Sequence, residues 1–288
     1  SISFTNAGAI VADQGFDLSA NTITNDNSIK ATGNSQWYFN SLSNTQGSRI
    51  SVDGDWKLGS STNSTGSITN YGKMYGADID FYGTNLTNGS EWQAKNLEPE
   101  DRAQFVAYDN NLKIDATSNI NNYGSLYAKN SFDIKTTSDI NNNGVIESFN
   151  VASNKLTAQT INNGDGSQFS GEIKTKGNLT IDSNILNNNS YGYGETKEYE
   201  EVLSYRWENT GCIGCSEGSA RFYTYLDYRY GTYKNQEGST IEVGQKLTGS
   251  DGVWNNFSSK ILADVIDIES LDKVNNKASV VNMEDVSL

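Results

Sequence analysis

A repeat of about twenty residues constrains what this chain can fold into. Its clearest copy begins at Ile120 and reads Ile-Asn-Asn-Tyr-Gly-Ser-Leu-Tyr-Ala, then Phe-Asp-Ile, then Ile-Asn-Asn, and the next copy opens at Asn142. Twenty residues separate the glycines of these two copies, Gly124 and Gly144. A unit with one turn and three short apolar segments is typical of three short strands joined by tight bends.

The free energies involved show that such units must stack. Each unit offers about six apolar side chains, and burying one is worth roughly 1.5–3 kcal/mol. Ordering a unit costs on the order of 1.5 kcal/mol for each of its residues, so one unit cannot fold alone. In a stack, every unit also gains strand hydrogen bonds to the units above and below it.

Asparagine, the commonest residue of the chain, recurs at one phase of the repeat. Copies close or open at Asn25, Asn44, Asn70, Asn88, Asn122, Asn142, Asn163, Asn187, Asn256 and Asn276. Stacking would place these side chains above one another, where their amides form a ladder. The alternative is that asparagine only marks turns, but turns alone do not explain a fixed phase. A variant turn, Asn-x-x-Gly-Ser-x-apolar, starts at Asn44, Asn163 and Asn235.

Three stretches do not follow the repeat cleanly. Residues 59–67 are rich in Ser, Thr and Gly and are expected to form a loop. Residues 91–109 hold a charge cluster and Pro99, the only proline; proline cannot donate to a central strand ladder, so we predict an excursion with room for a short helix. Residues 261–275 fit either a helical stripe or strands, and the spacing of the flanking copies favours strands.

Residues 189–234 depart from the repeat altogether. Nine of the sixteen tyrosines lie here, together with both cysteines, Cys212 and Cys215. Two segments, at about 197–207 and 221–230, are rich in aromatic and aliphatic residues and flank a centre rich in Gly, Ser and Asn. This pattern is typical of a long β-hairpin. The predicted organisation is therefore repeat units over 1–188, a Tyr-rich hairpin insertion over 189–234, and repeat units again over 235–288.

Composition and charge exclude several functional classes. The 288 residues include no histidine, which rules out catalytic triads that depend on it. A net charge of −14 argues against nucleic acid, heparin or an anionic membrane as a partner, because phosphate binding needs clustered Lys and Arg. No segment has the length and apolarity of a signal peptide or membrane span, so we expect the chain to be a piece of a larger protein.

The repeat Asn-x-Gly-x-Ile-x-Ala, with a second apolar pair and a closing Ile-x-Asn, resembles the filamentous haemagglutinin repeats of two-partner-secreted exoproteins. That family includes adhesins and the CdiA-type effectors of contact-dependent growth inhibition, and the resemblance covers 1–188 and 235–288. It implies an all-β, right-handed parallel β-helix, exported through an outer-membrane transporter to the surface of a Gram-negative bacterium. In the growth-inhibition members, a region after the repeats recognises an outer-membrane receptor on the target cell to allow toxin delivery.

The resemblance and the tyrosines together suggest a receptor-binding segment, with an outer-membrane protein a better candidate than a glycolipid. Tyr and Trp supply large, semi-rigid contact area, although aromatic pairs also stabilise hairpins without any partner. An adhesin or a passive β-helical stalk is the main alternative, and a carbohydrate-active enzyme is a distant one. The residues predicted to contact the receptor are Tyr199, Tyr205, Trp207, Phe222, Tyr223, Tyr225, Tyr228 and Tyr230.

No catalytic, cofactor or metal site is predicted. Cys212 and Cys215 form a Cys-x-x-Cys that could be a redox site or half of a zinc site, but no further Cys or His completes four ligands. In an exported protein they are expected to form a structural disulfide. The acidic residues Glu198, Glu200 and Glu201, and the pair Asp78 and Asp80, lie in strand-like runs without a basic cluster and are interpreted as solvated surface.

Overall fold

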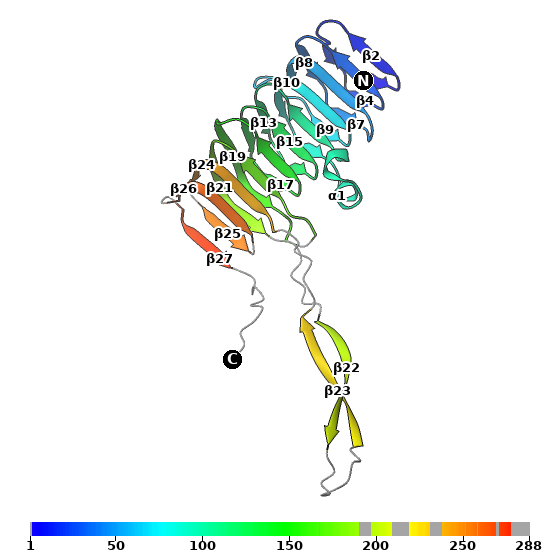
Figure 1. Ribbon diagram of the computed structural model, residues 1–288. Helices are drawn as coiled ribbons and strands as arrows, with labels where there is room; N and C mark the ends of the chain where they lie inside the picture. Colours follow the sequence, from blue (N-terminus) through cyan, green and yellow to red (C-terminus); the bar gives the residue numbers. More distant parts are fainter. Residues whose placement is uncertain are drawn as a thin grey trace, which may run out of the picture. The chain divides into compact units, whose positions relative to one another are not determined.

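The computed structural model describes residues 2–166, 168–189, 197–208, 219–230, 238–250, 252–257, 259–268 and 271–277, with the backbone alone in 197–208 and 219–230. Strands make up 62% of it and helices 4%. The chain divides into a larger unit, Ser1–Gly192 with Glu237–Leu288, and a smaller unit, Tyr193–Gln236. The larger unit is a parallel β-solenoid of about ten turns, which confirms the β-helix predicted from the repeat (Figure 1).

Each turn of the solenoid contributes one strand to each of three parallel columns. The first column holds β1 (Ser3–Asn6), β4 (Thr22–Asn25), β7 (Ser41–Asn44), β9 (Ser67–Asn70), β11 (Leu86–Asn88), β14 (Ile120–Asn122), β17 (Asp139–Asn142), the ends of β19 (Ser153–Asn163) and β21 (Asn178–Asn189), β25 (Val253–Phe257) and β27 (Lys273–Lys277).

The second column follows the corner after each of these strands. It holds β2 (Ala9–Ala12), β5 (Ser28–Ala31), the starts of β8 (Arg49–Leu58) and β10 (Lys73–Gly83), β12 (Gln104–Ala107), β15 (Ser125–Ala128), β18 (Val145–Ser148), β20 (Glu172–Thr175), and the starts of β24 (Thr240–Ser250) and β26 (Lys260–Asp267). The third column holds the rest of the long strands together with β3 (Leu18–Ser19), β6 (Ser35–Tyr38), β13 (Leu112–Ala116) and β16 (Phe132–Thr136).

The core of the solenoid follows from strand alternation. Neighbouring residues of a strand point to opposite faces, so the apolar residue at the middle of each short strand points inward. In the first column these residues are almost completely buried: Ile23, Leu42, Ile68, Leu86, Ile120, Ile140, Ile161 and Leu186. Aromatic rings fill the N-terminal turns, where Phe16 packs on Trp37 at 6.0 Å between ring centroids and Trp37 packs on Trp56 at 5.0 Å.

A continuous asparagine ladder lines the end of the first column, as the sequence predicted, except that Asn188 and not Asn187 forms its rung, because Asn188 lies opposite Asn163. In each rung, the side-chain amide donates to the side-chain oxygen of the next residue at 2.7–2.9 Å, through Asn6, Asn25, Asn44, Asn70, Asn88, Asn122, Asn142, Asn163, Asn188, Asn256 and Asn276. The second amide hydrogen donates to a backbone carbonyl at the start of the second column one turn further on, as from Asn122 to Val145 at 3.0 Å. Each buried amide therefore joins two turns and also ties two columns together.

A second ladder runs along the outer side of the same column with the opposite polarity. Its side chains alternate with the buried asparagines, and each amide donates back toward the preceding turn: Asn275 to Asn255, Asn255 to Asn187, Asn187 to Asn162, Asn162 to Asn141 and Asn141 to Asn121. The buried ladder donates toward the C-terminal turns instead.

The structure shortens the excursion that was expected over 91–109. Helix α1 (Glu91–Asn96) and the 3-10 helix η1 (Pro99–Asp101) form there, but Gln104–Ala107 already belongs to the second column as β12. Phe105 and Ala107 continue the inward alternation and are buried. Other expectations are confirmed, because 59–66 connects β8 to β9 as a loop and 261–275 contributes to strands β26 and β27.

Candidate functional site

The two longest insertions of the solenoid, 89–103 and 190–239, leave from one corner, the connection between the first and second columns. In regular turns this corner is short, as at residues 123–124 between β14 and β15. It is extended at 89–103, which holds α1 and η1, at 164–171, and at 190–239. Because this corner follows the asparagine ladder directly, the insertions emerge along one edge of the solenoid.

Stacking of the turns is not interrupted by the longest insertion. Strand β20 lies directly beside β24, with Glu172 opposite Thr240, although about sixty-eight residues separate them in the chain. The ladder bridges the same point, because the Asn163 amide donates to the Thr240 carbonyl at 3.1 Å. The Asn188 amide continues to Asn256 at 2.8 Å. The described turns on both sides therefore stack without any strand from 190–239.

The base of this insertion is fixed to the solenoid by loop 164–171. The Ser239 hydroxyl donates to the Asn189 carbonyl and accepts from the Gly171 amide at 3.0 Å. Gly164 has a φ of +82°, and a Cβ there would lie 2.2 Å from the Ser239 hydroxyl and 2.5 Å from the Asn189 carbonyl oxygen. Only glycine fits this close approach. The two points where the insertion begins and ends are thus held together.

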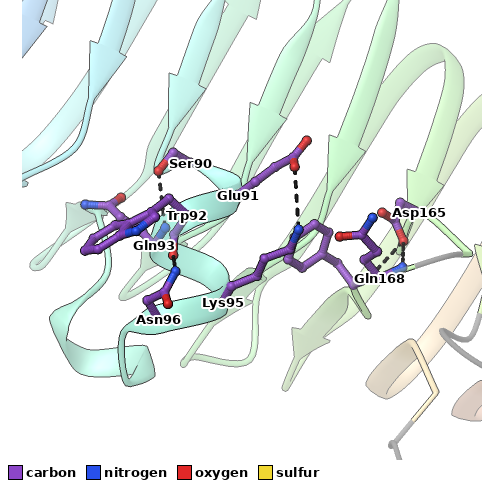
Figure 2. A network of polar contacts seen from close by, with 9 residues as sticks. Ser90, Glu91, Trp92, Gln93, Lys95, Asn96, Asp165 and Gln168 are labelled. Carbon is purple, nitrogen blue, oxygen red and sulfur yellow. Dashed lines mark hydrogen bonds and ion pairs between the residues drawn. The ribbon is translucent and has the colours of Figure 1, made fainter.

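Loop 164–171 also forms the platform next to helix α1. The Asp165 carboxylate accepts from the backbone amides of Gln168 and Phe169, at 2.7 and 2.9 Å, and closes a tight turn. The Phe169 ring packs edge-on against Tyr123 at 5.7 Å, and the Lys95 ammonium of α1 lies 5.3 Å from the centre of the ring. Figure 2 shows Lys95 reaching from α1 toward this loop.

The copies of the variant turn at Asn44 and Asn163 are arranged differently. At Asn44, the Ser48 hydroxyl donates to the Asn44 side chain at 2.6 Å and Ile50 enters the core. In the copy at Asn163, Phe169 lies outside the strands and Ile173 of β20 takes the core position instead. Phe169 is free to pack at the corner because the extra residues of the loop delay the next strand.

The electrostatics of the corner are mildly acidic. Burial raises the pKa of the Tyr123 hydroxyl, and the carboxylates of Glu91 and Asp165 raise it further. The Lys95 Nζ lies 3.9 Å from the Glu91 Oε2, so the positive charge of Lys95 is partly compensated within the helix. Within the described residues of 89–103 and 164–171, the basic side chains are Lys95 and Arg102 alone, too few for a phosphate-binding cluster.

The predicted receptor-contact residues lie in the smaller unit, in β22 (Lys197–Glu208) and β23 (Ser219–Tyr230), which pair antiparallel. Tyr199 is opposite Tyr228, and Tyr205 is opposite Phe222. Opposite positions share a face and adjacent positions alternate, so six of the eight residues occupy positions of one face: Tyr199, Tyr205, Trp207, Phe222, Tyr228 and Tyr230. Tyr223 and Tyr225 occupy positions of the other face. Cys212 and Cys215 lie outside the described residues.

Of the acidic residues considered for enzymatic chemistry, Asp78 and Asp80 lie in β10, and Glu198, Glu200 and Glu201 lie in β22. Burial raises the pKa of Asp78, and neighbouring Asp80 and Asp55 add to the shift; its carboxylate accepts from the Asn111 amide at 3.1 Å. Burial also raises the pKa of Glu147, which lines a shallow groove, but Lys174 stands between it and Glu242 in adjacent strands. Such alternation is typical of a surface charge network.

The described part of the chain contains neither a metal-binding cluster nor a membrane-spanning helix. Among those residues, no group of three or more His, Cys, Asp or Glu side chains is placed to hold a metal ion. No helix there is long and apolar enough to cross a membrane.

Comparison of the chain with protein-family models, curated proteins and solved structures gives no match.

Proposed function

We propose that the chain is the receptor-binding segment of a cell-surface filamentous exoprotein of the filamentous haemagglutinin and CdiA type. In this proposal, the insertion at 190–239 recognises an outer-membrane receptor protein on a target bacterium, so that the parent protein can deliver a toxin. The solenoid is exported by its two-partner transporter and carries the insertion at the producing cell's surface.

The observation that supports the proposal most directly is the continuity of the stack across the insertion. Strands β20 and β24 pair as neighbours, and β22 and β23 pair only with each other. Ordering inserted residues costs about 1–2 kcal/mol each for the backbone alone, and a passive stalk gains nothing from it. Segments of this kind, mounted on a rigid scaffold, commonly carry binding function.

The register of β22 and β23 supports recognition by aromatic contact. One face holds six of the predicted contact positions, and Tyr and Trp dominate binding hot spots because they bury large areas at low entropic cost. The net charge of −14 also favours aromatic and hydrogen-bonding contacts over Lys/Arg clamps.

Replacing 197–230 with a short Gly/Ser link tests the proposal. The strand signal in circular dichroism should stay at the level expected for the solenoid, and attachment of the purified chain to target cells should be lost. A matched control replaces 60–64, an exposed loop at another corner, with a Gly/Ser link of the same length and should attach as the parent does.

Attachment by the hairpin-replaced chain at the parent's level would reject recognition by the insertion and favour the stalk. Loss of attachment by the control would show that the assay reports general damage to the solenoid.

A further inference from the structure

Helix α1 buries a polar side chain and exposes an apolar one, which is the reverse of what stabilises a surface helix. Helices on a protein surface normally bury their apolar residues and expose the polar ones. Here Gln93 is only 1% exposed, whereas the adjacent Trp92 is 55% exposed. The buried Gln93 Oε1 has no partner among the described residues, and a buried acceptor without a partner is destabilising. Trp92 in turn forgoes the favourable burial of a large apolar surface.

The helix is nevertheless held firmly in this orientation. Its first turn is capped by the Ser90 hydroxyl, which accepts from the Gln93 backbone amide at 3.3 Å. The Gln93 side-chain amide donates to the Tyr71 carbonyl of the solenoid at 2.7 Å, and the Asn96 amide donates to the Trp92 carbonyl at 2.7 Å. Figure 2 shows the bonds made by Ser90 and by Asn96. Trp92 is thus an exposed indole on a pre-ordered support, which lowers the entropic cost of binding.

The surroundings of Trp92 are acidic. The excursion at 89–103 carries four acidic and two basic side chains, and Glu98, Glu100 and Asp101 are all exposed. Lys95 is paired with Glu91, and the Arg102 guanidinium donates to the Leu97 carbonyl at 3.0 Å. A lipid or glycolipid surface rich in phosphate would be repelled by this arrangement. A protein surface with exposed Lys and Arg would be attracted.

We propose that Trp92 is the anchor of a second receptor contact, in which its indole enters an apolar pocket of the partner protein that is ringed by Lys and Arg side chains. The inference rests on the proposed function, because the partner is the receptor recognised by the insertion at 190–239. The two contacts arise at the same corner of the solenoid, where loop 164–171 contacts α1 through Phe169 and Lys95 and contacts the base of the insertion through Ser239.

The test measures attachment of the bead-immobilised chain to a panel of intact Gram-negative cells. Trp92→Ala should weaken attachment at least about tenfold, as expected for removal of a hot-spot tryptophan, and Trp92→Phe should restore part of it. The double variant Glu98→Gln/Glu100→Gln should attach more slowly and with weaker dependence on salt. The matched control is Phe149→Ala, because Phe149 is an aromatic residue 42% exposed at another corner; it should attach as the parent does.

The outcomes separate this inference from the proposed function. If the parent attaches and Trp92→Ala attaches equally well, the Trp92 contact is wrong while recognition by the insertion stands. If Phe149→Ala loses as much as Trp92→Ala, attachment reflects non-specific aromatic adhesion and the inference is rejected. If the parent attaches to no cell of the panel, both proposals are rejected.

Discussion

The stability of the solenoid depends on single asparagines that use their full bonding capacity in a dry site. Asn122 is completely buried and accepts from Asn88 at 2.9 Å. Its own amide donates to Asn142 at 2.8 Å and to the Val145 carbonyl at 3.0 Å. An aspartate carboxylate donates nothing and a hydroxyl donates one hydrogen only, so neither replaces these two donations.

Replacing Asn122 with alanine should therefore be costly, because it leaves an amide donor of Asn88 and two carbonyl acceptors unpaired in the core. We expect a loss of about 2–4 kcal/mol in the free energy of unfolding, measured by urea denaturation. Asn121→Ala is the matched control, because Asn121 belongs to the half-exposed outer ladder, and it should cost less than about 1 kcal/mol. Equal losses would mean that the buried ladder adds no stability of its own.

At the scale of elements, two glycines at corners between the first and second columns are needed for different physical reasons. Gly47 and Gly164 both have a positive φ, +81° and +82°. A Cβ on Gly47 would meet nothing within 4 Å, whereas one on Gly164 would meet the hydroxyl of Ser239 and the carbonyl of Asn189. The first position needs glycine only for its backbone conformation, and the second also for space.

This difference predicts unequal effects of two identical substitutions. Gly47→Ala should cost about 1–2 kcal/mol, the strain of the left-handed conformation alone. Gly164→Ala should cost clearly more and should loosen the base of the insertion, seen as faster hydrogen exchange of the Gly171 amide that donates to Ser239. Similar costs for both variants, with unchanged exchange at Gly171, would contradict the proposed tight junction.

The same elements show how far sequence reasoning extends. Local periodicity is enough to predict the columns and the ladder, because every turn repeats the same inward apolar residue and the same asparagine, as at Ile120 and Asn122. The exposed Trp92 and the platform of Phe169 were not predicted, since both depend on which corner an insertion leaves from and what it meets three turns away. One signal for the exposed tryptophan was available. Trp92 follows the capping Ser90 by two residues, and no apolar residue lies three or four positions after it to share a buried helix face.

At the scale of the whole solenoid, stability should be modular, because each turn contacts only its neighbours. Deleting residues 123–142 removes one full turn and joins Asn122 to Asn143, which restores the same register: β14 pairs with β17, and β15 with β18, in each case twenty residues apart. The variant should keep its strand signal and a cooperative unfolding transition. Deleting only 123–132 should abolish the single cooperative transition, since it removes β15 from the second column and puts the later turns out of register with the earlier ones.

A single cooperative unfolding transition in the half-turn deletion would contradict the modular description. So would loss of folding in the full-turn deletion.

The regular rise of the turns has a consequence for binding strength. From the strand after which α1 begins to the strand after which the long insertion begins, the first column advances four steps, through β14, β17, β19 and β21. At about 4.8 Å per step, this is roughly 19 Å. This rise separates the two points at which α1 and the insertion leave the solenoid. Two contacts carried by one chain act as a bivalent ligand: once one is made, the second occurs at a high effective concentration. Individually weak contacts would then give strong avidity for a receptor that engages Trp92 and the insertion at the same time.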